Sequence, residues 1–249
     1  MTVLVTGAAG KVAGMLLPYL DGMPLRLTDR DAPPEPPGAE TVRGDLGAPG
    51  FAAAVLDGVS AVVHLAAMPY PDSTWDRLVA PNLDAVAALL DAAAAHQTPR
   101  LVLASSVHAM GGHLHAGRTP IQEGWPPSPC CRYGATKAFA EAAGRAHAYR
   151  TGASVLSLRL GAVQPEPFTL GMRPVWLGPD DLGQLVRRAL TADVRSGVYH
   201  GVSGGSPAWS IDAATAELGY RPVLDAGAYP VGDDTRTSLC EPGTDSPVR

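Results

Sequence analysis

A tyrosine and a lysine four residues apart, Tyr133 and Lys137, are the side chains best suited to chemistry in this sequence. On a helix, residues at this spacing share one face. A neighbouring ammonium group stabilises a phenolate, so the pair can exchange a proton with a substrate hydroxyl or ketone near neutral pH. The chain has two lysines, Lys11 and Lys137, and a coding preference for arginine is the alternative explanation of their scarcity.

Two serines, Ser105 and Ser106, follow the apolar run 101–104 and end a predicted strand. Ligands bind at the carboxyl ends of parallel strands in α/β sheets. A hydroxyl at that place can hold a substrate oxygen while charge develops on it. We select Ser106 over Ser105 as the catalytic serine, and the alternative for both is a turn cap.

A glycine-containing loop, Thr6-Gly7-Ala8-Ala9-Gly10-Lys11-Val12, joins a β-branched run to a segment with helical spacing. Glycines there allow a tight turn and let a pyrophosphate approach the amino end of the helix. The position of the loop, at the first strand–helix junction, is the context that such a motif requires. The sequence therefore predicts a dinucleotide site, and an ordinary tight turn is the alternative.

An aspartate, Asp29, closes the second predicted strand. A carboxylate there can accept a hydrogen bond from a ribose 2′-hydroxyl and repel a 2′-phosphate, which favours NAD. Arg30 follows directly and could accept a 2′-phosphate, so NADP is the alternative cofactor. Asp45, after the third strand, is placed to reach the adenine, and its alternative is a turn cap after Gly44. Lys137 is expected to reach the nicotinamide ribose.

Strands alternate with helices along most of the chain, which predicts an α/β fold with a doubly wound parallel sheet. We expect a single Rossmann-type domain over 1–231, with a small C-terminal substrate-binding appendage, substrate-binding segments at about 107–130 and 161–180, and a mobile tail over 232–249. The expected strands are 2–6, 25–28, 41–43, 61–67, 101–105 and 154–159; the expected helices are 10–20, 50–57, 82–96, 133–150 and 180–192. The stretch 31–39 is a proline-rich loop, and 109–130 shows no clear element.

The composition restricts the partners. The 249 residues carry a formal net charge of −5, which argues against nucleic acid or an anionic membrane as the main partner. There is no run of about 18 apolar residues and no basic segment ahead of the first strand, so we expect a cytoplasmic protein that does not enter a membrane. Its expected partner is a small-molecule substrate.

No metal site is expected from the spacing of the cysteines and histidines. Cys130, Cys131 and Cys240 form neither a disulfide framework nor a zinc pattern. The histidines of one segment, His108, His113 and His115, have no acidic or cysteine partner at ligand spacing. We expect His108 to line the substrate pocket, with an ordinary loop histidine as the alternative. The two adjacent cysteines are expected to serve packing, with reactive thiols as the alternative.

Together these motifs resemble an extended-type short-chain dehydrogenase/reductase of the NAD-dependent epimerase/dehydratase superfamily. The resemblance covers about residues 1–225 and is carried by Thr6-Gly7-x-x-Gly10, Asp29, Gly44-Asp45-Leu46, His64-Leu65-Ala66-Ala67, Asn82, Ser105-Ser106 and Tyr133-x-x-x-Lys137. Within that superfamily the chain is similar to uronate dehydrogenases at Ser105-Ser106-x-His108, 157–161, 165–167, Trp176-Leu177, Asp180-Asp181 and 218–222.

The resemblance implies a Rossmann fold, a Ser–Tyr–Lys catalytic set of Ser106, Tyr133 and Lys137, NAD, and oxidation of a cyclic uronic acid to its lactone. It also implies a homodimer through the helices at 82–96 and 133–150. The expected cofactor-binding residues are Gly7, Ala9, Gly10, Lys11, Val12, Asp29, Arg30, Asp45, Leu46, Leu65, Ala66, Ala67, Asn82, Tyr133 and Lys137. The expected substrate-binding residues are Met68, Ser106, Val107, His108, Gly161, Ala162 and Arg173.

The sequence departs from the pattern of uronate dehydrogenases on the substrate side. Val107 stands where an asparagine is expected. The arginines expected soon after Pro165-Glu166-Pro167 are replaced by 168–171, and Arg173 is the nearest arginine. A carboxylate clamp by arginine is geometrically demanding. The uronate substrate therefore does not carry over with the chemistry.

Three other functions remain as alternatives. The first is a ketoreductase of a natural-product or nucleoside biosynthetic pathway, since the pocket has lost acid-binding groups. The second is a nucleotide-sugar epimerase or dehydratase, which uses the same tyrosine–lysine pair but needs a larger C-terminal domain. The third is a non-catalytic dinucleotide-sensing regulator, although such sensors tend to lose that pair.

Overall fold

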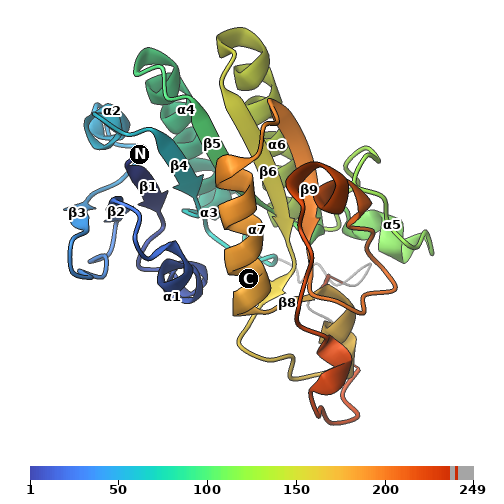
Figure 1. The fold of residues 1–249 in the computed structure, drawn as a ribbon. Coiled ribbons are helices and arrows are strands. Elements are labelled where there is room, and N and C mark those ends of the chain that lie inside the picture. The colour runs from blue at the N-terminus through green and yellow to red at the C-terminus, as the bar shows by residue number, and fades with distance from the viewer. Residues whose placement is uncertain (236–238, 241–249) are drawn as a thin grey trace.

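The computed structural model describes residues 1–235, 239 and 240. Its centre is a parallel sheet of seven strands in the order β3-β2-β1-β4-β5-β6-β9 (Figure 1). The strands are β1 (Val3–Thr6), β2 (Leu25–Asp29), β3 (Glu40–Arg43), β4 (Ala61–His64), β5 (Arg100–Ser106), β6 (Ser154–Leu160) and β9 (Ser196–Gly201). The chain order reverses between β1 and β4, so a ligand crevice is expected at their carboxyl ends. The predicted doubly wound Rossmann sheet is confirmed.

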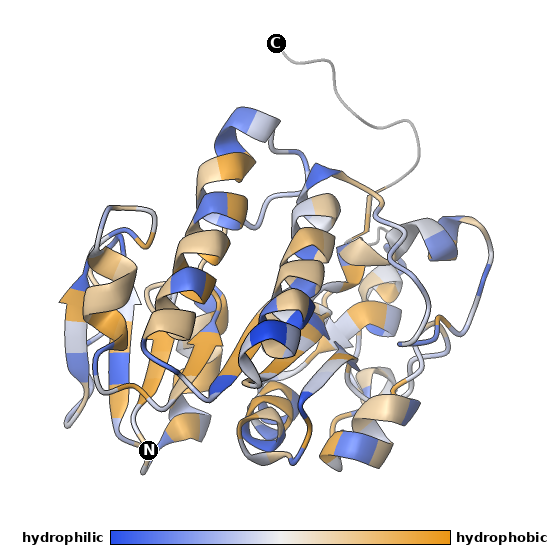
Figure 2. Ribbon diagram, turned by 90° about the horizontal axis from the view of Figure 1, so that it is seen from above, coloured by the Kyte–Doolittle hydropathy of each residue, from blue (hydrophilic) through white to orange (hydrophobic). Residues whose placement is uncertain are grey.

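Helices cover both faces of the sheet, as the view from above shows (Figure 2). On one face α1 (Lys11–Leu16), η1 (Leu17–Leu20) and α7 (Pro179–Thr191) pack around one hydrophobic cluster. On the other face α2 (Phe51–Leu56), α4 (Ala85–Ala95) and α6 (Arg132–Thr151) pack around a second. In β1, Val3 and Val5 join the first cluster and Leu4 the second. This alternation explains why the strands read as continuous apolar runs.

A continuous helical segment, Trp75–Ala95, is long and apolar enough to cross a membrane by length and composition alone. It contains α3 (Trp75–Val79), the π-helical turn η2 (Ala80–Asp84) and α4. Its residues Val86 and Leu89 pack in the cluster under α2 and α6. The segment is therefore part of the helical layer that covers this face of the Rossmann sheet.

The segments that follow the carboxyl ends of β5, β6 and β9 build a smaller layer beside the sheet. They contain η3 (Val107–Ala109), α5 (Gly111–His115), the paired strands β7 (Ala162–Val163) and β8 (Trp176–Leu177), and the turns η4 (Leu170–Val175), η5 (Ala214–Leu218) and η6 (Ala226–Ala228). Helix α5 lies where no element was expected, and β9 was not predicted. A third hydrophobic cluster joins Met110, Ile121, Val202 and Trp209.

The described part of the segment 232–249 packs against this layer. Gly232 pairs with Thr169 in an isolated bridge, and the Leu170 amide donates to the Asp234 carbonyl at 2.7 Å. Leu239 is buried in the third hydrophobic cluster. Residues 236–238 and 241–249 lie outside the described part of the chain.

Candidate active site

The glycine loop after β1 forms a cradle against the next strand end. Gly7 has a φ of 71°, and a Cβ there would lie 2.6 Å from the Ala66 amide nitrogen. Glycine is therefore required by both the backbone conformation and the close approach. The Gly10 amide donates to the Gly7 carbonyl at 3.0 Å, and α1 begins at Lys11. A backbone of this shape fits a dinucleotide pyrophosphate.

The carboxylate of Asp29 lies at the end of β2, next to the glycine loop. Its Oδ2 accepts a hydrogen bond from the Ala9 amide at 3.0 Å, and its Oδ1 accepts one from the Asp31 amide at 3.2 Å. These bonds fix the carboxylate at the rim of the loop. Asp45 instead accepts from the Gly47 amide at 2.9 Å, which is the turn cap considered as its alternative, although Asp45 also faces the cleft.

A cleft of about 530 Å³ follows the carboxyl ends of β1, β2, β3 and β4. Most of the expected cofactor residues line it, namely Gly7, Ala9, Gly10, Lys11, Val12, Asp29, Arg30, Asp45, Leu46, Leu65, Ala66 and Ala67. Met68, expected on the substrate side, lines the same cleft. The cleft therefore has the position and lining of a dinucleotide site.

Asn82 is buried behind this cleft rather than open to it. Its Oδ1 accepts from the Met68 amide at 2.7 Å, and its Nδ2 donates to the Met68 carbonyl at 3.1 Å and to Thr136 Oγ1 at 3.0 Å. Both ends of the amide are thus engaged with protein. Asn82 ties the loop after β4 to α6. In the structure it therefore positions that loop, and its contact with a cofactor stays a prediction.

Ser106, Tyr133 and Lys137 come together where β5 ends beside α6. All three side chains are nearly buried. Lys137 Nζ lies 5.6 Å from the centre of the Tyr133 ring and donates to the Ala104 carbonyl at 2.8 Å. Ser106 Oγ accepts from the His108 amide at 3.2 Å, and the Ser106 hydroxyl is near enough to Tyr133 to lower the pKa of its phenol. The sequence-predicted catalytic set is therefore assembled in space.

Burial dominates the protonation of this set. It raises the pKa of Tyr133 to about 12; the Ser106 hydroxyl lowers this pKa in part, and the nearby charge of Cys131 raises it further. Burial lowers the pKa of Lys137 to about 8. His64, which is bonded through Nδ1 to Thr6 Oγ1 at 2.8 Å, has its pKa lowered to about 3 by burial and then by the charge of Lys137. His64 is therefore neutral at physiological pH.

A glycine lets α6 approach the end of β5 closely enough to build the set. A Cβ on Gly134 would lie 2.3 Å from the His108 carbonyl oxygen. Any other residue would push the first turn of α6 away from η3. Cys131 Sγ accepts from the Gly134 amide at 3.3 Å and so caps the same turn. Together these contacts hold Tyr133 beside Ser106.

Ser105 faces a buried ion pair that the sequence analysis missed. Its Oγ donates to Glu141 Oε1 at 2.6 Å. Arg159 on β6 donates to both oxygens of the same carboxylate at 2.8 Å each. Successive residues of a strand point to opposite sides, so Ser105 anchors α6 while Ser106 faces Tyr133. The residues Glu141 and Arg159 carry no spacing signal in the sequence, because they meet only where α6 packs against β6.

Three of the expected substrate-binding residues make tight protein contacts. Val107 is packed in the third hydrophobic cluster with Met110 and Leu239, rather than open to a ligand. Arg173 donates from Nη2 to the Tyr229 carbonyl at 2.5 Å. Its Nε is buried and has no hydrogen-bond partner among the described residues. His108 packs edge-on against the Tyr133 ring, with 5.6 Å between ring centres.

Gly161 and Ala162 lie where the chain leaves β6. The Gly161 amide donates to the Gly201 carbonyl at 2.8 Å. Ala162 pairs with Trp176 in the small sheet of β7 and β8. Both residues therefore border the end of the sheet next to Ser106, which pairs with Leu160.

Three sulfur atoms surround the ring of His108, contrary to the expectation that the cysteines lack a histidine partner. Its Nδ1 lies 3.5 Å from Cys130 Sγ, 3.5 Å from Cys131 Sγ and 3.6 Å from Cys240 Sγ. The cysteines are free thiols. Sequence spacing could not reveal this cluster, because Cys240 reaches it from the far end of the chain.

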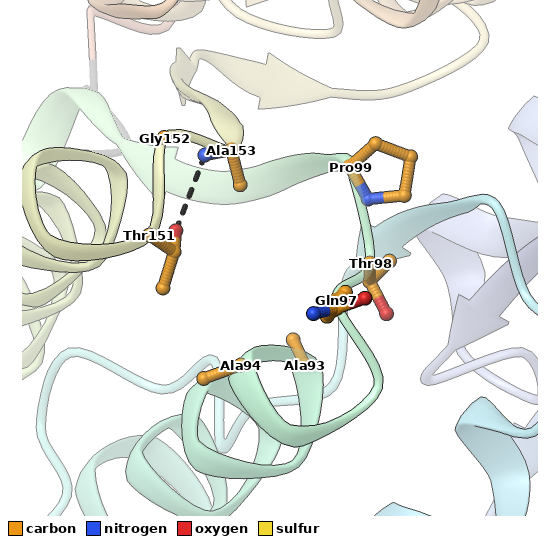
Figure 3. A pocket seen from close by; sticks show the side chains of 8 residues that line it. All are labelled: Ala93, Ala94, Gln97, Thr98, Pro99, Thr151, Gly152 and Ala153. Carbon is orange, nitrogen blue, oxygen red and sulfur yellow. Dashed lines mark hydrogen bonds between the residues drawn. The ribbon is translucent and has the colours of Figure 1, made fainter.

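A second hollow, of about 430 Å³, lies at the opposite end of the strands, next to the amino ends of β5 and β6. It is lined by the carboxyl ends of α4 and α6 and by the residues that precede β5 and β6 (Figure 3). Thr151 Oγ1 accepts a hydrogen bond there from the Ala153 amide at 3.2 Å. The lining offers no charged side chain, so the chemistry belongs to the other edge.

The chain is similar to known proteins over most of its length. Residues 3–165 match the model of the NAD dependent epimerase/dehydratase family. Uronate dehydrogenase of Pseudomonas putida is 31% identical over 245 residues, which cover 93% of this chain and 90% of that protein. NAD-dependent glucose-6-phosphate dehydrogenase of Haloferax volcanii is 31% identical over 249 residues, which cover 91% and 95%.

A solved structure gives the same picture in three dimensions. The complex of a tyrosine-to-alanine mutant of uronate dehydrogenase from Agrobacterium tumefaciens with NAD superposes with a TM-score of 0.83 at 28% identity. The match covers 91% of this chain and 86% of that one. The similarity therefore includes both the sheet and the smaller layer beside it.

Proposed function

The chain belongs to the NAD dependent epimerase/dehydratase family, and on that premise we propose that Ser106, Tyr133 and Lys137 are its catalytic residues. It is an NAD-dependent oxidoreductase that interconverts a secondary alcohol or lactol and a carbonyl on a sugar-like substrate. The alternative of a non-catalytic sensor does not fit this enzymatic family. The observation that carries the catalytic assignment is the close grouping of the three side chains at the end of β5.

The three side chains divide the work of moving a proton. Ser106 holds the substrate oxygen by a hydrogen bond. Because the pKa of Tyr133 is raised to about 12, its phenol must first lose its own proton; as phenolate it then takes the proton from the substrate hydroxyl, so the O–H bond breaks as the carbonyl forms. The ammonium of Lys137, fixed by the Ala104 carbonyl, stabilises the phenolate. NAD, when bound, supplies the acceptor for the hydride of the substrate carbon. In the reverse direction Tyr133 returns the proton.

The cofactor-binding residues are those that line the cleft, with Asp29 as the residue that selects NAD. Its carboxylate is held at the glycine loop by the Ala9 amide, where it would accept the ribose 2′-hydroxyl and repel a 2′-phosphate. Arg30 lines the same cleft, so weaker use of NADP is part of the proposal.

We favour a neutral sugar-like substrate over a uronate. Arg173 lies in the expected substrate-binding segment 161–180, and its guanidinium donates to the Tyr229 carbonyl. A bidentate carboxylate clamp uses two parallel N–H donors of a guanidinium, and in Arg173 one Nη2 donor is already engaged by this carbonyl. Val107, which replaces the expected asparagine, is buried in a hydrophobic cluster. Oxidation of a neutral lactol, or reduction of a neutral ketone, fits these contacts, and a uronate remains the second candidate because of the relatives.

Two assays test the proposal. Tyr133→Phe should abolish turnover while NAD still binds, and full activity of this variant would contradict the assignment. Absorbance of the reduced nicotinamide should then be followed with neutral aldoses, galacturonate and glucuronate, each with NAD and NADP. Reduction of NAD by a uronate with a lower KM than by any neutral sugar would overturn the preference for a neutral substrate.

We also propose a soluble, cytoplasmic homodimer formed through α6 and the helical segment Trp75–Ala95. Four large apolar side chains of these helices are exposed, namely Trp75, Val79, Phe139 and Tyr149. A second copy would cover them. Light scattering after size exclusion should give twice the mass of 25.7 kDa, and Phe139→Glu should shift it to the monomer.

A further inference from the structure

Four potential metal ligands gather beside the catalytic tyrosine. They are His108 in η3, the adjacent Cys130 and Cys131 before α6, and Cys240 near the C-terminus. Their ligand atoms all lie within 4.8 Å of one another, which no other group of histidine, cysteine or carboxylate side chains matches in the described residues. His108 is nearly buried and the three cysteines are half-buried. No spacing motif unites them, so the fold alone makes the cluster.

The sulfur–nitrogen distances within the cluster agree with a tetrahedral site. Zinc–sulfur bonds of about 2.3 Å and zinc–nitrogen bonds of about 2.0–2.1 Å, at tetrahedral angles, separate sulfur from nitrogen by about 3.6 Å. The three sulfur–nitrogen distances to His108 Nδ1 are 3.5, 3.5 and 3.6 Å. A disulfide would instead draw two sulfurs to about 2.05 Å and leave the third thiol and the imidazole without a role.

We propose that Cys130, Cys131, Cys240 and Nδ1 of His108 bind one structural Zn²⁺. Three thiolates and one imidazole are a ligand set typical of structural zinc. Four protein ligands complete the tetrahedral coordination, so the metal has no open position for a substrate or water. The site therefore acts through structure and takes no part in the hydride chemistry.

Contacts around the ligands support a preformed site. The Gly134 amide points at Cys131 Sγ from 3.3 Å, where it would stabilise a thiolate. Outer contacts of this kind orient ligands and tune the affinity of a site. The ligands are thus already held near the geometry that the metal needs.

The metal would join three parts of the chain that meet at the substrate side. Cys131 caps the turn of α6 that carries Tyr133. The His108 ring packs against the Tyr133 ring. Cys240 follows Leu239, which is buried in the third hydrophobic cluster. Zinc would therefore cross-link the C-terminal segment to the loop beside the catalytic tyrosine. It would hold these segments in position and take no part in the reaction.

Metal analysis of the full-length protein, expressed without a polyhistidine tag and purified without chelator, tests this inference. We expect one zinc per chain by mass spectrometry of the elements. Cys240→Ser and His108→Ala should each lower the zinc content by more than about tenfold. His115→Ala is the matched control, because His115 is an exposed histidine of the same segment, and it should keep the full zinc content.

A titration of the reduced, metal-free protein with Co²⁺ gives a second readout. Thiolate-to-cobalt charge transfer and the intense visible bands of tetrahedral cobalt are expected, and Zn²⁺ should displace them. The inference is overturned if the reduced wild-type chain binds neither Zn²⁺ nor Co²⁺, or if His115→Ala loses as much zinc as His108→Ala. It is also overturned if two of the thiols form a disulfide in protein kept anaerobic from lysis onward. None of these readouts depends on the oxidoreductase activity.

Discussion

A buried ion pair under the catalytic residues offers a quantitative test of how the site is held. Arg159 donates from Nε and Nη2 to the two oxygens of Glu141 at 2.8 Å each. The two side chains are 2% and 4% exposed, and Ser105 Oγ adds a bond of 2.6 Å to the same carboxylate. Removing one member leaves the other charge buried without its partner, which costs about 3–5 kcal/mol.

Arg159→Met and Glu141→Leu should therefore each lower the free energy of unfolding by about 3–5 kcal/mol. With a urea m value of about 2–3 kcal/mol/M, the unfolding midpoint would fall by about 1–2.5 M. The double variant removes both charges and should lose clearly less than the sum of the single losses. Equilibrium unfolding in urea, followed by tryptophan fluorescence and circular dichroism, measures all four proteins.

The matched control is the exposed ion pair of Arg26 and Glu40, which has a similar distance of 2.7 Å but side chains that are 15% and 55% exposed. Glu40→Gln should change the free energy of unfolding by less than about 1 kcal/mol. Losses below about 1 kcal/mol for both Arg159→Met and Glu141→Leu, or a double variant that loses the full sum, would refute the reasoning.

Three further outcomes are expected. Asn82→Ala breaks bonds of 2.7, 3.1 and 3.0 Å, so urea unfolding should show a loss of about 2–4 kcal/mol; an unchanged midpoint would contradict the positioning role. Asp29→Ser should lower the ratio of kcat/KM for NAD over NADP by about 10–100-fold in steady-state assays; a constant ratio would remove Asp29 as the selecting residue. Burial lowers the pKa values of His64 and His200 to about 3 in the folded state, so the unfolded state binds more protons below about pH 6.5. Stability should be full above that pH and fall as the pH drops toward 3, and His64→Asn should reduce the slope of urea midpoint against pH.

The half of the molecule that binds the dinucleotide could be predicted from the sequence because its signals are local. Buried parallel strands read as short apolar runs, and the glycine loop directly follows the first of them. The helix that carries Tyr133 was predicted over 133–150, and α6 spans Arg132–Thr151. The choice of Ser106 over Ser105 agrees with strand alternation, which sends Ser105 to Glu141.

The substrate half could not be predicted in the same way, because distant contacts decide it. Strand β9 contains two glycines and a short apolar core, Gly197-Val198-Tyr199-His200-Gly201, which no local rule distinguishes from a loop. Arg173 was nominated as the nearest arginine, yet the turn η4 directs it to the Tyr229 carbonyl. Cys240 contacts His108, which lies 132 positions earlier in the sequence, so no local pattern predicts this contact.

This division explains how the family's hydride chemistry could be kept while the substrate changes. The cleft is built from the backbone and from loops fixed to strand ends, and Gly7 and Asp29 lie within it. Val107 and Arg173 lie in the layer beside the sheet, which packs through its own hydrophobic clusters. Neither Val107 nor Arg173 lines that cleft, so substitutions at these positions leave the cofactor residues in place. A change of substrate therefore needs no change in the cleft.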